Sequence, residues 1–144
     1  DEILNGAIDD GVRVMIVAGY NIQRTPLVEN MYNNSDATVD TKYASAGATV
    51  ALLDETLGEN YEQKCTDCGH NHLSPDGVID ASTCILPENT WFIKDAPHVP
   101  CTYGSELAEM LFWLLSYEGQ PTVSTNELYP QFQYADEPQN LYHF

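Results

Sequence analysis

The sequence predicts one α/β domain, built on a partial parallel sheet with flanking helices. Three observations point to this fold class: an apolar β-prone run over residues 12–18, a second over 90–94, and an amphipathic helix over 105–116. Strands that alternate with helices along a chain are typical of a parallel sheet covered by helices. Two strands are too few for a complete sheet, so we expect either unrecognised strands or a sheet continued by other sequence.

The first half of the chain contains one predicted strand and one predicted helix. Val12–Ala18 is apolar and β-prone, which indicates a buried strand ending at Gly19. The following stretch, 21–43, is polar and rich in turn residues, and is predicted mainly as loop. A helix is predicted over Ala46–Leu57, because its apolar residues share one helical face and Gly58 suits a C-terminal cap.

The second half contains the clearest signals. The segment 78–82, "VIDAS", is compatible with a short strand or the start of a helical turn, and Thr90–Lys94 is a strongly β-prone strand. Ser105–Ser116 is the most distinct helix, with Ser105 placed to cap it. Its predicted buried face comprises Leu107, Met110, Leu111 and Leu114, widened by Phe112 and Trp113.

The tail is rich in proline and aromatic residues and has little periodicity. We therefore expect a domain over residues 1–120 and a C-terminal extension over 121–144 that packs on it.

The charge balance excludes some classes of partner. The 144 residues include 22 acidic and 5 basic side chains, for a net charge of −17. Such a surface repels phosphate backbones and anionic lipids, so we expect no nucleic-acid partner. No apolar run approaches the ~20 residues that span a bilayer, so no integral membrane segment is expected.

An acid and a histidine on loops form the first candidate site. Asp76 lies on an Asp-Gly turn, and His98 lies just past the predicted strand 90–94. In open α/β sheets, functional groups collect beyond the carboxyl ends of strands. A carboxylate bonded to Nδ1 would orient His98 as a general base. Asp80 and Asp95 are alternative acids, and a turn Asp and a loop His with no shared role is the alternative interpretation.

The order of these parts resembles the C-terminal portion of an α/β-hydrolase of the lipase and esterase kind. That family often carries an acid turn D-G-x-V, here 76–79, followed by a serine, here Ser82. A final strand, the catalytic histidine and a closing helix come next, and here these are Thr90–Lys94, His98 and Ser105–Ser116. The resemblance implies a Ser-His-Asp hydrolase of small esters or lipids, with His98 as the base and Asp76 as the acid.

The nucleophile of that family is missing from the pattern. Its serine sits on G-x-S-x-G, which this sequence lacks, and Ser45 and Ser105 have no such elbow. We therefore expect the chain to be the C-terminal part of an α/β-hydrolase-like fold, inactive alone and completed by an upstream N-terminal part. No cofactor is required by this mechanism.

The alternative function is a non-catalytic α/β binding module. The localisation stays open, with a secreted or cell-surface bacterial protein as the working expectation.

The second candidate site is "CTDCGHNH", which contains Cys65, Cys68, His70 and His72. The C-x2-C spacing and these ligand types are typical of structural zinc, although four ligands so close together would be unusually tight. Cys84 or Cys101 could replace one of them. A disulfide or free thiols are the other interpretations, and a small zinc-dependent protein is a third function class.

Overall fold

The structure is a computed structural model that describes residues 2–22, 32–65, 69–98, 105–125 and 128–135. Its helices and strands are, in chain order, α1 (Glu2–Asp9), β1 (Ile16–Tyr20), α2 (Thr41–Ala44), β2 (Thr49–Val50), β3 (Ile79–Asp80), β4 (Thr90–Lys94), α3 (Ser105–Ser116) and β5 (Phe132–Tyr134). Short 3₁₀ turns cover Ala81–Thr83, Pro87–Asn89 and Val123–Thr125.

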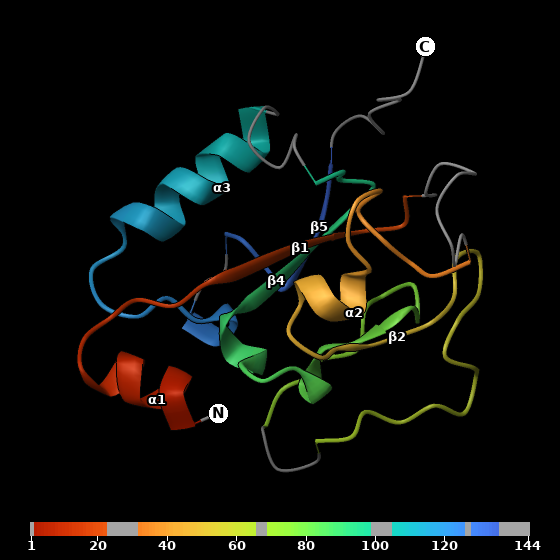
Figure 1. Cartoon of the computed structure of the whole chain (residues 1–144), viewed down its shortest axis with the longest axis horizontal. Coiled ribbons are helices and arrows are strands. Elements are labelled where there is room, and N and C mark those ends of the chain that lie inside the picture. Colours follow the sequence, from red (N-terminus) through yellow and green to blue (C-terminus); the bar gives the residue numbers. More distant parts are fainter. Residues whose placement is uncertain (1, 23–31, 66–68, 99–104, 126–127, 136–144) are drawn as a thin grey trace.

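A three-stranded parallel sheet in the order β1-β4-β5 forms the centre of the molecule (Figure 1). Both predicted strands are confirmed, although β1 begins at Ile16 and continues through Tyr20. In the register Tyr20 lies opposite Lys94, which lies opposite Tyr134. All three strands therefore end together at one edge, which we call the carboxyl edge. The expected α/β class with a parallel sheet and flanking helices is confirmed at this level.

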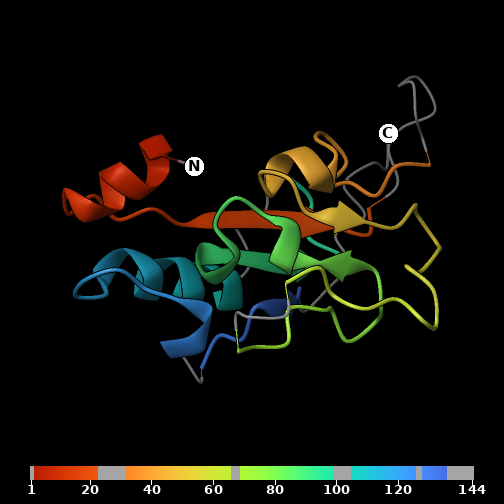
Figure 2. The same cartoon turned by 90° about the horizontal axis from the view of Figure 1, so that it is seen from below.

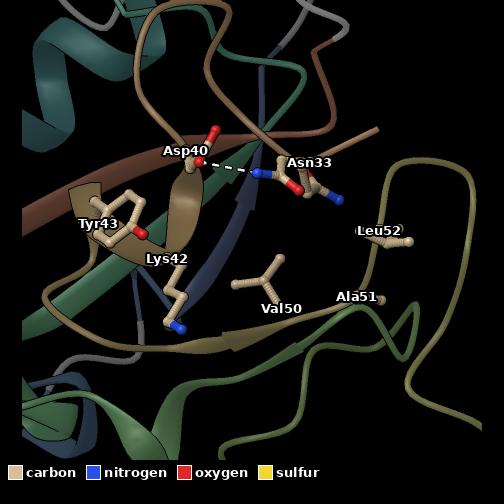
Figure 3. Close-up of a pocket in the computed structure, with 8 residues that line it drawn as sticks. Asn33, Asp40, Lys42, Tyr43, Val50, Ala51 and Leu52 are labelled. Carbon is tan, nitrogen blue, oxygen red and sulfur yellow. Dashed lines mark hydrogen bonds between the residues drawn. The ribbon is translucent and has the colours of Figure 1, made fainter. Parts of the chain in front are cut away.

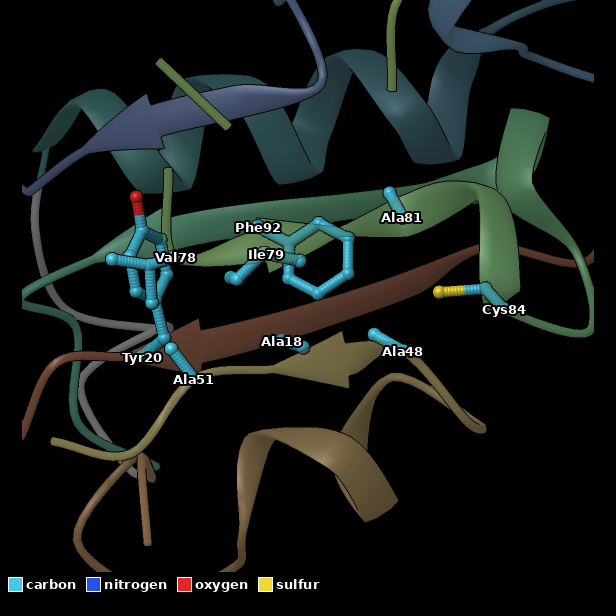
Figure 4. Packing of buried hydrophobic residues seen from close by; sticks show 9 residues of the cluster. All are labelled: Ala18, Tyr20, Ala48, Ala51, Val78, Ile79, Ala81, Cys84 and Phe92. Atoms are coloured by element: carbon cyan, nitrogen blue, oxygen red, sulfur yellow. The ribbon is translucent and has the colours of Figure 1, made fainter. Parts of the chain in front are cut away.

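The two faces of the sheet are covered by different elements. Figure 2 shows α3 on one side of the β1–β4 pair and α2 on the other. The antiparallel pair β2–β3 lies on the α2 side, where its residues join Ala18, Tyr20 and Phe92 in one buried cluster (Figure 4). On the other face, Trp91 and Ile93 pack against α3. Successive residues of β4 thus alternate between the two cores, as a doubly covered strand requires.

Helix α3 has the predicted bounds and a narrower buried face than predicted. Leu107, Met110 and Leu114 are buried against the sheet, and Trp113 packs at the edge of that cluster. Phe112 is 74% exposed, so its predicted place in the buried face is wrong. Leu107, Met110 and Leu114 are spaced i, i+3 and i+7, so they form one apolar stripe along the helix, and this stripe packs against the sheet. In the described residues no helix is long and apolar enough to span a membrane.

The helix predicted over 46–57 is wrong. Ala46, Gly47 and Asp54 have positive φ angles of 57°, 114° and 63°, which a right-handed helix does not allow. The backbone amides bond across the fold instead, with the Ala51 N–H donating to the Val78 carbonyl. Thr49–Val50 pairs with β3 as a short strand, because the helical pattern of this segment is too weak to prevent that pairing.

The segment 78–82 contains both structures that its sequence allowed. Ile79–Asp80 is strand β3, and Ala81–Thr83 is a 3₁₀ turn. The tail contributes more than a surface extension, because Phe132–Tyr134 is the third strand of the parallel sheet. This strand is only three residues long and follows Pro130, which explains why its sequence carried no strand signal.

Asp80 is the centre of a buried polar network next to this core. The residue is fully buried, and its carboxylate accepts hydrogen bonds from the Tyr61 hydroxyl at 2.8 Å, the Lys64 amide at 3.0 Å, and the Ser82 amide and hydroxyl. Burial alone would raise the pKa of this carboxyl, but the hydrogen bonds outweigh it and hold the pKa below its ordinary value of 3.8.

We predict that Asp80→Asn destabilises the protein by about 1–3 kcal/mol at pH 7, because an amide nitrogen would face the Tyr61 and Lys64 donors. A depressed pKa contributes stability above 3.8 that is lost as pH falls, so the difference should shrink below about pH 3.8. Urea unfolding from pH 3 to 7 measures it. Glu59→Gln, an exposed site with the same charge change, is the control. A difference that does not change with pH would contradict the assignment.

Candidate functional site

The chain leaves β1 and β4 through two strained turns at the carboxyl edge. Asn21 and Asp95, the residues directly after these strands, have φ angles of 68° and 60°. Asn and Asp tolerate this left-handed region better than other non-glycine residues. The Asn21 side-chain amide donates to the Asp95 carboxylate at 2.5 Å, and the Asp95 N–H donates to the Tyr20 carbonyl. The loops that follow both strands are thereby tied together.

Gly19 permits a close backbone approach in this region. A Cβ atom at this position would lie 2.0 Å from the Ala96 carbonyl oxygen and 3.0 Å from Cβ of Asp36. Only glycine therefore lets the loop after β4 and the turn at Asp36 meet over the end of β1. The backbone at Gly19 thus decides which residues can reach each other there.

Asp36 and His98 meet at this point. The Asp36 Oδ2 lies 2.7 Å from His98 Nδ1, and the Asp36 carbonyl accepts the His98 backbone N–H at 2.8 Å. The other carboxylate oxygen accepts the amides of Thr38 and Val39 at 2.9 and 2.7 Å, so a short turn holds the acid in place. The Asp36 side chain is 4% exposed, whereas that of His98 is 50% exposed.

This arrangement defines the tautomer of the neutral histidine ring. An ionised Asp36 can only accept, so His98 Nδ1 carries the hydrogen and Nε2 keeps the lone pair. Because Nδ1 is engaged by Asp36, Nε2 is the ring nitrogen left for another partner of this half-exposed side chain. A buried carboxylate bonded to a half-exposed imidazole is an arrangement that general base catalysis uses.

Asp76, the acid expected from the family resemblance, has other partners. Its Oδ2 lies 2.9 Å from Lys94 Nζ and accepts the Tyr20 hydroxyl at 3.2 Å. Burial would raise the pKa of Asp76, but hydrogen bonds from Ser74 and Lys94 and the Lys94 charge lower it overall. Burial and the Asp76 charge raise the pKa of Tyr20 strongly. Asp76 thus lies at the carboxyl edge, while the described bonds of His98 go to Asp36.

No local signal in the sequence singles out Asp36 as the partner of His98. It lies 62 residues before His98 in a polar turn, whereas the Asp-Gly turn at 76 has a recognisable form. Only the Asx-type turn, in which the Asp side chain bonds the amides two and three residues on, could have marked it as a fixed acid.

The predicted zinc ligands fall into two groups. His70 and His72 lie together and contact Glu88, at 3.1 and 3.2 Å from its Oε1. Cys68 and Cys101 lie outside the described residues, and the Cys65 backbone amide donates to Ser82 Oγ. Cys84 is buried in the core, and this burial raises the pKa of its thiol to about 11, so it is a protonated packing residue.

A small pocket lies between α2 and β2 (Figure 3). Lys42 and Tyr43 line it from α2, Val50 and Leu52 from the other side, and the Asn33 amide donates to Asp40 at its rim. Its volume is about 210 Å³, which is below the ~300–1,000 Å³ of typical ligand sites. Neither Asp36 nor His98 lines it, so it is not part of the dyad site.

Comparisons with protein-family profiles, with curated proteins and with solved structures found no match for this chain. The functional argument therefore depends on the geometry of the chain's own residues.

We predict that Gly19→Ala destabilises the protein by about 1–3 kcal/mol, because the new methyl group would collide with the Ala96 carbonyl. Gly6→Ala is the matched control, since a Cβ there meets nothing within 4 Å and alanine favours helix α1 by about 1 kcal/mol. Urea unfolding of both variants measures the effect. Equal stabilities would mean that the close approach at Gly19 does not exist.

Proposed function

We propose that this chain supplies the general base and its acid partner to a serine hydrolase that acts on carboxylic esters or lipids. The observation that carries the proposal is the hydrogen bond between Asp36 Oδ2 and His98 Nδ1, with the acid buried and the imidazole half exposed. In this proposal His98 is the general base, as the resemblance implied. Asp36 takes the role that the resemblance implied for Asp76, because it is the carboxylate in contact with the ring.

The proposed reaction is an acyl transfer in two steps. A serine from sequence outside this chain attacks the ester carbonyl while His98 Nε2 removes its proton. His98 then gives that proton to the leaving alcohol, and a water activated by the same nitrogen releases the acid. Asp36 holds the Nδ1 hydrogen and stabilises the imidazolium that forms in each step. A positioned base of this kind contributes about 10²–10⁴-fold to the rate.

The fold is consistent with this role. Asp36 and His98 meet beyond the carboxyl ends of parallel strands, where α/β enzymes place their catalytic groups. The resemblance to an α/β-hydrolase adds the order of strand, histidine and closing helix. The chain departs from the family pattern in the position of its acid. Asp36 lies in the loop after β1, whereas the family's acid would lie on the Asp-Gly turn at Asp76.

A non-catalytic binding module is the second candidate function. It is favoured by Phe112 and Leu115, which are 74% and 63% exposed and stand one turn apart on α3. Large apolar side chains exposed together are typical of contact surfaces. The two functions are separated by reactivity, because only the hydrolase contains an activated serine.

We predict that a fluorophosphonate probe labels the complete product of the reading frame and leaves this 144-residue chain unlabelled. The probe reacts with activated serines, and the intact mass reports one adduct. Labelling of the short chain would place the nucleophile within it. No labelling of either protein would remove the hydrolase proposal in favour of the binding module.

We predict that in the complete product His98→Ala and Asp36→Asn each lower the rate of nitrophenyl ester hydrolysis by about 10²–10⁴-fold. In Asp36→Asn the amide oxygen still accepts from Thr38 and Val39, but its N–H₂ faces His98 and forces the hydrogen onto Nε2. Asp76→Asn is the matched control and should change the rate only a few-fold. The reverse pattern would restore Asp76 as the acid.

A further inference from the structure

Three potential metal ligands converge at the opposite edge of the sheet from the dyad. His70 and His72 come from an irregular segment, and Glu88 comes from the 3₁₀ turn that precedes β4. One ligand atom from each lies within 4.8 Å of the other two. We propose that these three side chains bind one Zn²⁺ ion. The site is independent of the proposed hydrolase function.

The hydrogen bonds of Gln131 fix the tautomer of His72. The Gln131 amide nitrogen donates to the carbonyls of Pro87 and Thr90 at 2.7 and 3.0 Å, which sets the orientation of the amide. Its oxygen therefore faces His72 Nδ1, at 2.7 Å, and accepts a hydrogen from it. In the neutral imidazole the lone pair then lies on Nε2. An outer partner that orients a histidine in this way is typical of metal sites.

That lone pair faces a carboxylate. His72 Nε2 lies 3.2 Å from Glu88 Oε1, yet within the described part of the chain neither this nitrogen nor either carboxylate oxygen has a hydrogen-bond partner. The His72 side chain is 1% exposed, so its ring has little contact with bulk solvent. Two lone pairs at this distance repel each other, and buried polar atoms without partners are costly. A cation between them turns the repulsion into coordination.

The two distances from Glu88 to the histidines match the spacing of ligands around zinc. Tetrahedral zinc with bonds of 2.0–2.1 Å places its ligand atoms about 3.3 Å apart. Glu88 Oε1 lies 3.1 Å from His70 Nδ1 and 3.2 Å from His72 Nε2, close to that spacing. Two imidazole nitrogens and one carboxylate oxygen form a recurrent zinc donor set, and three protein ligands leave a position for water. A depression lined by His70, His72 and Gln131 adjoins the cluster.

The bound ion would add a second link between two parts of the fold that Gln131 already joins by hydrogen bonds. It would hold the irregular segment that contains His70 and His72 against the turn at the start of β4. The ligand set keeps the two histidines expected from the sequence and replaces the cysteine pair with Glu88, which no motif marked. Glu88 lies 16 residues after His72, so only the folding of the 69–88 segment brings it to the histidines.

Zinc titration of the purified 144-residue chain, stripped with a chelator, tests the proposal. We expect one Zn²⁺ per chain by native mass spectrometry and calorimetry, with a higher melting temperature in excess zinc. Glu88→Gln and His70→Ala should weaken binding by more than about 10-fold, and Gln131→Ala by about 10–100-fold. His70 is 47% exposed, so its replacement leaves the core intact. His98→Ala is the control histidine variant and should bind zinc as tightly as the unaltered chain.

Cobalt substitution identifies the donor atoms. Co²⁺ held by nitrogen and oxygen lacks the intense sulfur charge-transfer band in the near ultraviolet, so we expect visible absorption without that band. A Cys65→Ser, Cys68→Ser double variant should keep its zinc. Absence of zinc binding would overturn the proposal and leave the His72–Glu88 contact as an ion pair. Binding that survives Glu88→Gln but fails in the cysteine variant would overturn it in favour of thiolate ligands.

Discussion

The in-register parallel pairing of β1 with β4 is the constraint on which the rest of the structure depends. It joins segments far apart in the sequence and brings Tyr20 opposite Lys94 at the carboxyl edge. Because the two strands end together, the chain leaves both at the same point, and Asn21 bonds Asp95 there. Gly19, the penultimate residue of β1, then lets the loop after β4 approach the turn that contains Asp36. The Asp36–His98 contact is a consequence of this pairing.

Two buried carboxylates and a partly buried one, Asp76, show how a chain with 22 acidic residues places some of them in its interior. Asp36, Asp76 and Asp80 each receive several donors, and these donors include a histidine, a lysine, hydroxyls and backbone amides. A buried carboxylate is tolerated only when its lone pairs are satisfied in this way. The three carboxylates differ in whether the side chain that they hold is exposed to solvent. Asp76 and Asp80 are closed structural networks, whereas Asp36 holds a side chain that still reaches solvent.

The two proposed sites occupy opposite edges of one sheet. The dyad lies beyond the carboxyl ends of β1 and β4, and the histidine–glutamate cluster lies before the amino ends of β4 and β5. A strand of five residues separates them by roughly 15 Å. The same strand therefore orders both sites, through the turn with Glu88 at one end and the loop with His98 at the other. Neither site needs the other for its chemistry.

Local sequence was sufficient for the elements with strong intrinsic preferences. Strands β1 and β4 and helix α3 were predicted because each encodes its structure within a few residues. The signals were the apolar run of β1, the β-prone residues of β4 and the amphipathic pattern of α3. The helix predicted over 46–57 failed because backbone bonds to the β3 region outcompeted a weak helical pattern. Strand β5 escaped because three residues carry too little periodicity to be recognised.

The sequence by itself determined the α/β class, the acidic surface, and the presence of His98, His70 and His72 as chemically capable side chains. Only the tertiary structure decided their partners. Asp36 and Glu88 carry no motif, and each reaches its histidine through contacts between distant segments, over a glycine in one case and beside an oriented glutamine in the other. Spacing along a chain limits which residues can meet, but strand register and close backbone approach select which of them do.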